Sequence, residues 1–201
     1  TSLTVRAVDG SQTWTAVDEW RNYGLGYTQP EPVSWSADGR YFYYANVPNP
    51  DGCAVLVNGG ELWRLDLTNG TVTEVAPYIG LVMALSRDET KLAVNASYGR
   101  GFLIRDLATG AEQTVELPQP AESWQMGGLE WAPDGRHLFI IQVLNPCNGQ
   151  APQTTALVRV DLDEAGVGLS NVEGAVTILE PDARNFTLVQ WIRPDEVRLE
   201  D

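Results

Sequence analysis

A strand–turn–strand motif that returns along the chain restricts the fold more than any other feature of this sequence. The motif reads VSWSADGRYFYYANV at 33–47 and LEWAPDGRHLFIIQV at 129–143. A less regular copy, MALSRDETKLAVNAS, occupies 83–97, and VQWIRPDEVRLED occupies 189–201. In the two clearest copies an Asp-Gly pair separates apolar and aromatic runs, which is the strongest short-range signal of a β-hairpin. The chain is therefore expected to consist of repeated hairpins.

A second family of hairpins alternates with the first. It reads ELWRLDLTNGTVTEV at 61–75 and GFLIRDLATGAEQTV at 101–115, with further copies starting at Leu3 and, with a longer connection, at Ala156. Together the two families give four antiparallel strands, and this unit returns at spacings of 50, 46 and 61 residues between turn aspartates. A four-stranded unit of about 40–50 residues is the signature of a β-propeller blade. The sequence thus predicts an all-β fold with residues 1–201 in a single β-propeller domain.

Two parts of the repeat resemble a known family. The segments WSADGR (35–40) and WAPDGR (131–136) resemble the W-S-P-D-G-R signature of TolB-like propeller repeats, and LWRLDLTNG and FLIRDLATG resemble the third-strand pattern of the same family. The resemblance extends over nearly the whole chain. It implies the propeller architecture but no particular activity, because such blades occur in binding proteins, peptidase accessory domains and cell-surface proteins.

The phase of the repeat predicts how the blades are divided along the chain. We expect complete blades at 31–77, 79–118 and 124–181, and two half-blades at 1–18 and 183–201. The half-blades should pair with each other within one molecule to form a fourth blade, with Leu3–Val8 beside Val197–Glu200 in one sheet, because this closure would remove two open sheet edges. The alternatives are pairing between molecules and a piece of a six- to eight-bladed propeller. The tryptophans within strands are expected in the core: Trp35, Trp63, Trp131 and Trp191.

Long connections between hairpins are expected on one face of the propeller, and short turns within hairpins on the other. Long loops gathered on a rigid scaffold are where binding residues usually lie. The loops contain aromatic and arginine side chains of the kind that anchor interfaces and stack on sugars or peptides. The candidate binding residues are Trp20, Arg21, Tyr23, Tyr27, Tyr98, Arg100 and Trp124. In the alternative interpretation, these side chains pack against the loops and hold them in place.

Charge and composition exclude several classes of function. The chain carries 27 acidic and 13 basic residues, a formal net charge of −14, which repels nucleic acid and anionic membrane surfaces. No stretch is long and apolar enough to insert into a membrane. His137 is the only histidine, and neither a G-x-S-x-G segment nor a glycine-rich phosphate loop is present. We therefore expect no catalytic residues, no cofactor and no metal, with the turn residues Asp38, Asp134 and His137 in structural roles.

These observations favour a non-catalytic, extracytoplasmic binding module that recognises a protein or glycan on its long-loop face. A self-associating structural protein of the cell surface, forming a filament or layer through its terminal strands, is one alternative. The other is a fragment of a larger propeller that serves as the accessory domain of an enzyme.

The two cysteines generate the first testable prediction. Cys53 and Cys147 each follow an Asn-Pro pair in equivalent loops of two blades, and we expect them to form a disulfide in an oxidising compartment. The bond would close a long loop and stabilise the fold by up to about 4–5 kcal/mol in the chain-entropy model. Mass spectrometry without reduction should find the two loops cross-linked. Two thiols that alkylate freely in the native protein would contradict this prediction and weaken the extracytoplasmic assignment.

Overall fold

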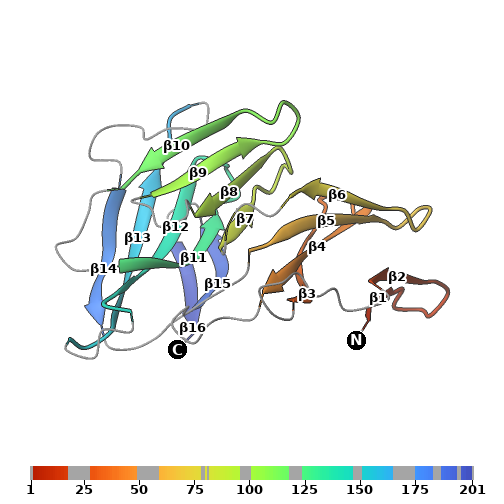
Figure 1. Ribbon diagram of the computed structural model, residues 1–201, viewed down its shortest axis with the longest axis horizontal. Helices are drawn as coiled ribbons and strands as arrows, with labels where there is room; N and C mark the ends of the chain where they lie inside the picture. Colours follow the sequence, from red (N-terminus) through yellow and green to blue (C-terminus); the bar gives the residue numbers. More distant parts are fainter. Residues whose placement is uncertain are drawn as a thin grey trace.

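A computed structural model of the protein describes eleven stretches of the chain: 2–17, 28–48, 59–77, 80, 82–95, 101–117, 124–146, 151–164, 175–182, 187–193 and 196–200. Side chains are described as far as residue 164, with the exception of Thr28. All regular structure in these stretches is β-strand (Figure 1), and none of it is a helix that could cross a membrane. The prediction of an all-β chain is confirmed.

Twelve of the strands form three four-stranded antiparallel sheets, each in sequence order. The first sheet contains β3 (Thr28–Trp35), β4 (Tyr41–Pro48), β5 (Glu61–Asp66) and β6 (Val72–Ala76). The second contains β7 (Met83–Leu85), β8 (Lys91–Asn95), β9 (Gly101–Asp106) and β10 (Glu112–Glu116). The third contains β11 (Trp124–Trp131), β12 (His137–Leu144), β13 (Thr154–Asp161) and β14 (Ala175–Asp182). We refer to these sheets as blades.

The remaining strands form two separate two-stranded sheets. One consists of β1 (Leu3–Arg6) and β2 (Thr13–Val17), the other of β15 (Thr187–Arg193) and β16 (Glu196–Glu200). The first strand of each blade contacts the first strand of the next, so that β3, β7, β11 and β15 lie side by side in that order. Successive blades therefore pack face to face around a common axis (Figure 1), as in a β-propeller.

Three apolar clusters hold the blades together. Phe102, Trp131 and Ile140 belong to the cluster between the second and third blades. Tyr43 and Leu92 belong to the cluster between the first and second. A third cluster joins β1–β2 to the first blade through Val5, Ala16, Phe42, Tyr44 and Leu65. Burial of a large apolar side chain contributes about 1.5–3 kcal/mol, so these inter-blade contacts are the main source of stability.

Hydrogen bonds within the turns explain why the motif is so regular. In the first blade Asp38 Oδ1 accepts from Ser36 Oγ (2.7 Å) and from the backbone N–H of Arg40 (2.9 Å), and Ser36 Oγ accepts from the N–H of Tyr41 (2.7 Å). The hydrogen bond from Ser36 is the main reason that the pKa of Asp38 is lowered. Asp134 accepts in the same way from the N–H of Arg136. The structural roles predicted for Asp38 and Asp134 are confirmed.

The predicted closure of the terminal half-blades is not what the structure shows. Strands β1–β2 pack against the first blade, β15 lies beside β11, and the two hairpins belong to separate sheets. Each half-blade is fixed by its neighbour in the sequence, and the three blades between them do not curve far enough to bring the ends together (Figure 1). The prediction that Leu3–Val8 lies beside Val197–Glu200 in one sheet is therefore wrong. The number of blades in a complete ring stays a prediction.

The strand tryptophans occupy different environments. Trp131 is only 3% exposed, and its Nε1 donates to the carbonyl oxygen of Ala84 at 3.0 Å. Trp63 is half-buried and packs against the cluster under β1–β2. Trp35 is 56% exposed, so its assignment to the core is wrong, because no first strand of a preceding blade covers it in the described chain. The side chain of Trp191 lies outside the described residues.

The turn glycines lead to a prediction about stability. Gly39 has a φ of +70°, and a Cβ at this position would meet no other atom within 4 Å. A side chain here is therefore opposed only by the left-handed backbone, which costs most residues about 1–2 kcal/mol. Gly39→Val should lower the free energy of unfolding, measured by urea denaturation, by about this amount. Asn tolerates the left-handed region, so Gly39→Asn should cost less. Equal losses from the two variants would show that backbone conformation does not limit stability at this turn.

Candidate functional site

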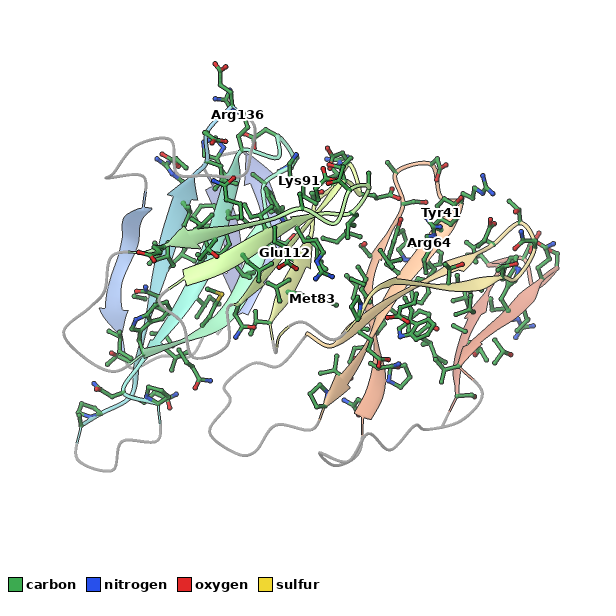
Figure 2. The ribbon with its side chains drawn as sticks, turned by 45° about the horizontal axis from the view of Figure 1, so that its top comes forward. Tyr41, Arg64, Met83, Lys91, Glu112 and Arg136 are labelled. Carbon is green, nitrogen blue, oxygen red and sulfur yellow. The ribbon has the colours of Figure 1, made fainter. Side chains whose placement is uncertain are left out.

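The two ends of the strands differ in the length of the connections that they carry. At one end, which we call the turn end, strands are joined by the short turns 36–40, 67–71, 86–90, 107–111 and 132–136, and by one long connection, 162–174. At the other end, the loop end, the longest connections are 18–27, 49–60 and 145–153. In Figure 2 the labelled Lys91 and Arg136 lie toward the turn end, and Met83 lies toward the loop end. The loop end is the face on which binding is predicted.

Most of the predicted binding residues belong to the loops outside the described stretches. These are Trp20, Arg21, Tyr23, Tyr27, Tyr98 and Arg100, and the predicted disulfide partners Cys53 and Cys147 also lie outside them. Trp124 is described: it is the first residue of β11, it is half-buried, and it packs against the cluster between the second and third blades. At least part of its indole therefore serves the core.

Glycines fix the points at which two of these loops rejoin the sheets. A Cβ on Gly60 would lie 2.1 Å from the carbonyl oxygen of Asn46, and one on Gly101 would lie 1.9 Å from that of Val115. Both distances are too short for any side chain, so the backbone at these two positions is pressed against the neighbouring strand. Glycine is the residue that permits such an approach. The connections 49–60 and 96–100 are therefore held to the framework at the residues where β5 and β9 begin.

Polar side chains add to this frame at the loop end. Glu61 accepts from Asn46 Nδ2 and from Trp63 Nε1, both at 3.2 Å. Asn95 accepts from the backbone N–H of Val82 through its Oδ1 at 2.8 Å, while its own N–H donates to the carbonyl of Val82 at 3.0 Å. These hydrogen bonds fix the positions of the strand ends in the first two blades. The strands at the loop end therefore form a rigid support for the loops that they carry.

Glu130 is an ionisable residue that motif analysis missed. It occupies the inner strand β11, on the face opposite Trp131 and therefore toward β15. Its side chain keeps access to solvent, but the protein around it displaces enough water to raise the pKa of its carboxyl to about 7. The equivalent positions of the other blades are Ser34 and Ala84. Aligning the three complete blades would have identified Glu130, because a charged residue stands there where the other two blades have a small one.

The turn end carries a polar network that connects the first and second blades. The hydroxyl of Tyr43 donates to Glu89 Oε2 at 2.5 Å, and Glu89 Oε1 accepts from the N–H of Ala37 at 3.2 Å. Burial, followed by the hydrogen bond to Glu89, raises the pKa of Tyr43 to about 12. Glu89 itself has a φ of +62°, in a turn position that glycine holds in the first and third blades. Glu89 therefore adopts a left-handed backbone conformation that is unfavourable for a non-glycine residue, and its side chain joins two blades. Its role is structural.

Arginines beside this network are also engaged by the fold. Arg40 forms an ion pair with Asp66 at 2.8 Å, which is the main reason that the pKa of Asp66 is lowered. The guanidinium groups of Arg40 and Arg64 lie 4.9 and 4.4 Å from the centre of the Tyr41 ring, within range of cation–π attraction. The polar groups of this part of the turn end are thus largely used by contacts within the protein.

The arrangement around His137 does not resemble a catalytic one. Its Nδ1 lies 2.8 Å from Asp134 Oδ2, and its Nε2 lies 3.8 Å from Asp161 Oδ1. Both ring nitrogens are therefore directed at carboxylates, and neither holds a nucleophile. Within the stretches that the structure describes, no group of three or more potential ligands could hold a metal ion.

Comparisons with known proteins show the fold. No family model matches the sequence, and no curated protein does. TolB from Acinetobacter baumannii is similar in structure, with 17% identity and a TM-score of 0.51 over 100% of this chain and 46% of that one. An auxiliary nutrient-binding protein from Bacteroides thetaiotaomicron has 14% identity and a TM-score of 0.51 over 94% of this chain and 39% of its own. An oligogalacturonate lyase from Vibrio parahaemolyticus has 16% identity and a TM-score of 0.47 over 85% and 46%.

The matches with a TM-score of 0.51 show that the chain has the fold of a TolB-like β-propeller. The chain spans less than half the length of the structures named above. The resemblance seen in the W-S-P-D-G-R repeats is confirmed at the level of the fold. At such low identity the comparisons do not extend to a ligand or an activity.

The raised pKa of Glu130 predicts a dependence of stability on pH. A carboxyl whose pKa rises from about 4.5 to about 7 on folding binds its proton more tightly in the folded protein. The free energy of unfolding should therefore fall, as far as this group is concerned, as the pH rises between these values. Urea denaturation of the wild type and of Glu130→Gln from pH 4.5 to 8 should show the wild type losing stability relative to the variant. A difference that does not change with pH would contradict the assignment.

Proposed function

We propose that this protein is a non-catalytic binding module that recognises a protein or glycan on its loop end. The observation that supports this most directly is the contrast between the two ends of the blades. Apart from the connection 162–174, the turn end is built from short turns, whose polar groups bond to one another where the structure describes them, whereas the loop end carries several long connections on a frame fixed by Gly60 and Gly101. Rigid strands that carry long loops are the usual construction of a binding face.

The chemistry of the described residues agrees with a role without catalysis. The ring nitrogens of His137, the only histidine of the sequence, face two aspartates. The carboxylate of Glu89 is occupied by hydrogen bonds that join the first two blades. Solved structures with this fold and a TM-score of 0.51 include TolB and an auxiliary nutrient-binding protein. We further propose an extracytoplasmic location, in keeping with the predicted disulfide.

A binding experiment with matched variants tests this proposal. A glycan array and an immobilised peptide library would serve as probes for the wild-type protein. Trp20→Ala and Tyr23→Ala should each weaken binding by about tenfold or more, because aromatic side chains at the centre of an interface contribute most of its energy. The melting temperature of both variants should stay close to that of the wild type.

Arg136→Ala is the control for that experiment. Arg136 is exposed at the turn end, and its backbone carbonyl, rather than its side chain, accepts the N–H of Leu162. The control variant should therefore bind as the wild type does. Loss of binding in Arg136→Ala, with normal binding in Trp20→Ala and Tyr23→Ala, would place the site at the turn end and overturn the proposal.

A further inference from the structure

A buried amide without a hydrogen-bond partner lies near the loop end of the third blade. Gln142 belongs to β12 and is only 8% exposed. In the part of the chain that the structure describes, its side chain forms no hydrogen bond. Burial of such an amide is unfavourable, because the group loses its hydrogen bonds to water and gains none in return. Gln142 therefore lowers the stability of the blade that contains it.

The first blade shows how the same position is satisfied elsewhere in the protein. Asn46 is the equivalent residue, because it is the sixth residue of β4 as Gln142 is the sixth of β12. Asn46 Nδ2 donates to Oε2 of Glu61, its partner on the third strand, at 3.2 Å. The partner of Gln142 on the third strand is Ala156, whose side chain has no polar atom. The third blade thus has the amide without its acceptor.

The register of the third blade places Gln142 beside an aromatic ring. Side chains alternate between the two faces of a strand, so Gln142 lies on the same face as Ile140, which belongs to the cluster between the second and third blades. On β11 Gln142 pairs with Met126, and the next pair on this face toward the loop end joins Trp124 to Leu144. Trp124 is therefore a diagonal neighbour of Gln142. Such positions are about 7–8 Å apart, within reach of long side chains.

The two side chains are complementary to one class of ligand. The amide of Gln142 has N–H donors and a carbonyl acceptor side by side, and two adjacent sugar hydroxyls can accept from the one and donate to the other. A peptide unit directs its N–H and C=O to opposite sides, so it cannot use both. Trp124 is half-buried, and the apolar face of a sugar ring can stack on the exposed part of its indole. We infer that Gln142 and Trp124 form a binding site for a neutral glycan that enters from the loop end.

Such a site gives the proposed binding module a defined ligand, and it exists only if that proposed function is correct. The ligand should be neutral, because the formal charge of −14 on the chain repels acidic glycans. The amide of Gln142 has already lost its water in the folded protein, so a sugar hydroxyl that bonds to it does not have to remove that water. Gln142 therefore strengthens binding although it lowers the stability of the free protein, a combination common at functional sites.

Gln142→Met tests the site through stability, because methionine has nearly the length of glutamine without its polar groups. The melting temperature of this variant should rise by about 2–4 °C, since it buries no unpaired amide. Gln113→Met is the matched control: Gln113 is exposed on β10, so the same substitution should change neither the melting temperature nor binding. A melting temperature of Gln142→Met that stays the same or falls would show that the fold itself satisfies the amide, for example through a buried water, and would overturn the inference.

An array of neutral gluco-, xylo- and manno-oligosaccharides tests the site through binding, with the immobilised peptide library as a second arm. The wild type should bind a glycan of the array, and Gln142→Met should bind it about tenfold more weakly. A deoxy analogue of that glycan, which lacks one of two adjacent hydroxyls, should also bind the wild type about tenfold more weakly. The same analogue should cause little further loss in Gln142→Met, because both changes remove the same hydrogen bond.

The possible results separate the glycan site from the proposed function. Equal glycan binding by the wild type and Gln142→Met, equal losses with the deoxy analogue in both proteins, or binding to peptides alone would each overturn the glycan site and leave the binding module in place. A wild-type protein that binds no glycan and no peptide would overturn both.

Discussion

Face-to-face packing of apolar sheets is the interaction on which the rest of this structure depends. Four-stranded blades with apolar side chains on both faces, such as Phe42 and Tyr43 on neighbouring positions of β4, need a neighbour on each side. In the described chain the second blade has a four-stranded neighbour on each side, whereas the first blade has one on one side and the two-stranded hairpin β1–β2 on the other. Within the described chain, this difference accounts for the exposure of Trp35, because the hairpin β1–β2 does not cover it.

Much of the fold could be predicted from local sequence, because turns are local structures. Serine, aspartate and glycine around Asp38, and aspartate and glycine around Asp134, specify hydrogen bonds that close within five residues, and these form as expected. Closure of the ends could not be predicted in this way. It depends on the rotation between successive blades, which is set by side chains packed between sheets, such as Trp131 against β7. Trp35 and Trp131 share almost the same motif, and only the neighbouring sheet distinguishes the two environments.

The candidate site could be predicted to a smaller extent, because it also depends on contacts between residues that are distant in the sequence. Loop length identifies the loop end, but the aromatic residues chosen on that basis lie outside the described stretches, apart from Trp124, which is partly engaged in the core. The positions that motif analysis missed, Glu89 and Glu130, are departures from the repeat. Each places a carboxylate where other blades have glycine or a small residue, and its effect depends on contacts that are distant in the sequence, such as that between Glu89 and Tyr43. Comparison of the repeats with one another would have revealed both.

The close approach of Gly60 and Gly101 to neighbouring strands has a consequence for how such a protein can change over generations. Each glycine separates a loop from the strand that follows, so the length and composition of the loop can drift without moving the sheet behind it. The glycine itself has no such freedom, because every other amino acid would collide with the adjacent backbone. New specificities could therefore arise by exchange of whole loops between fixed points, while the propeller that carries them stays the same.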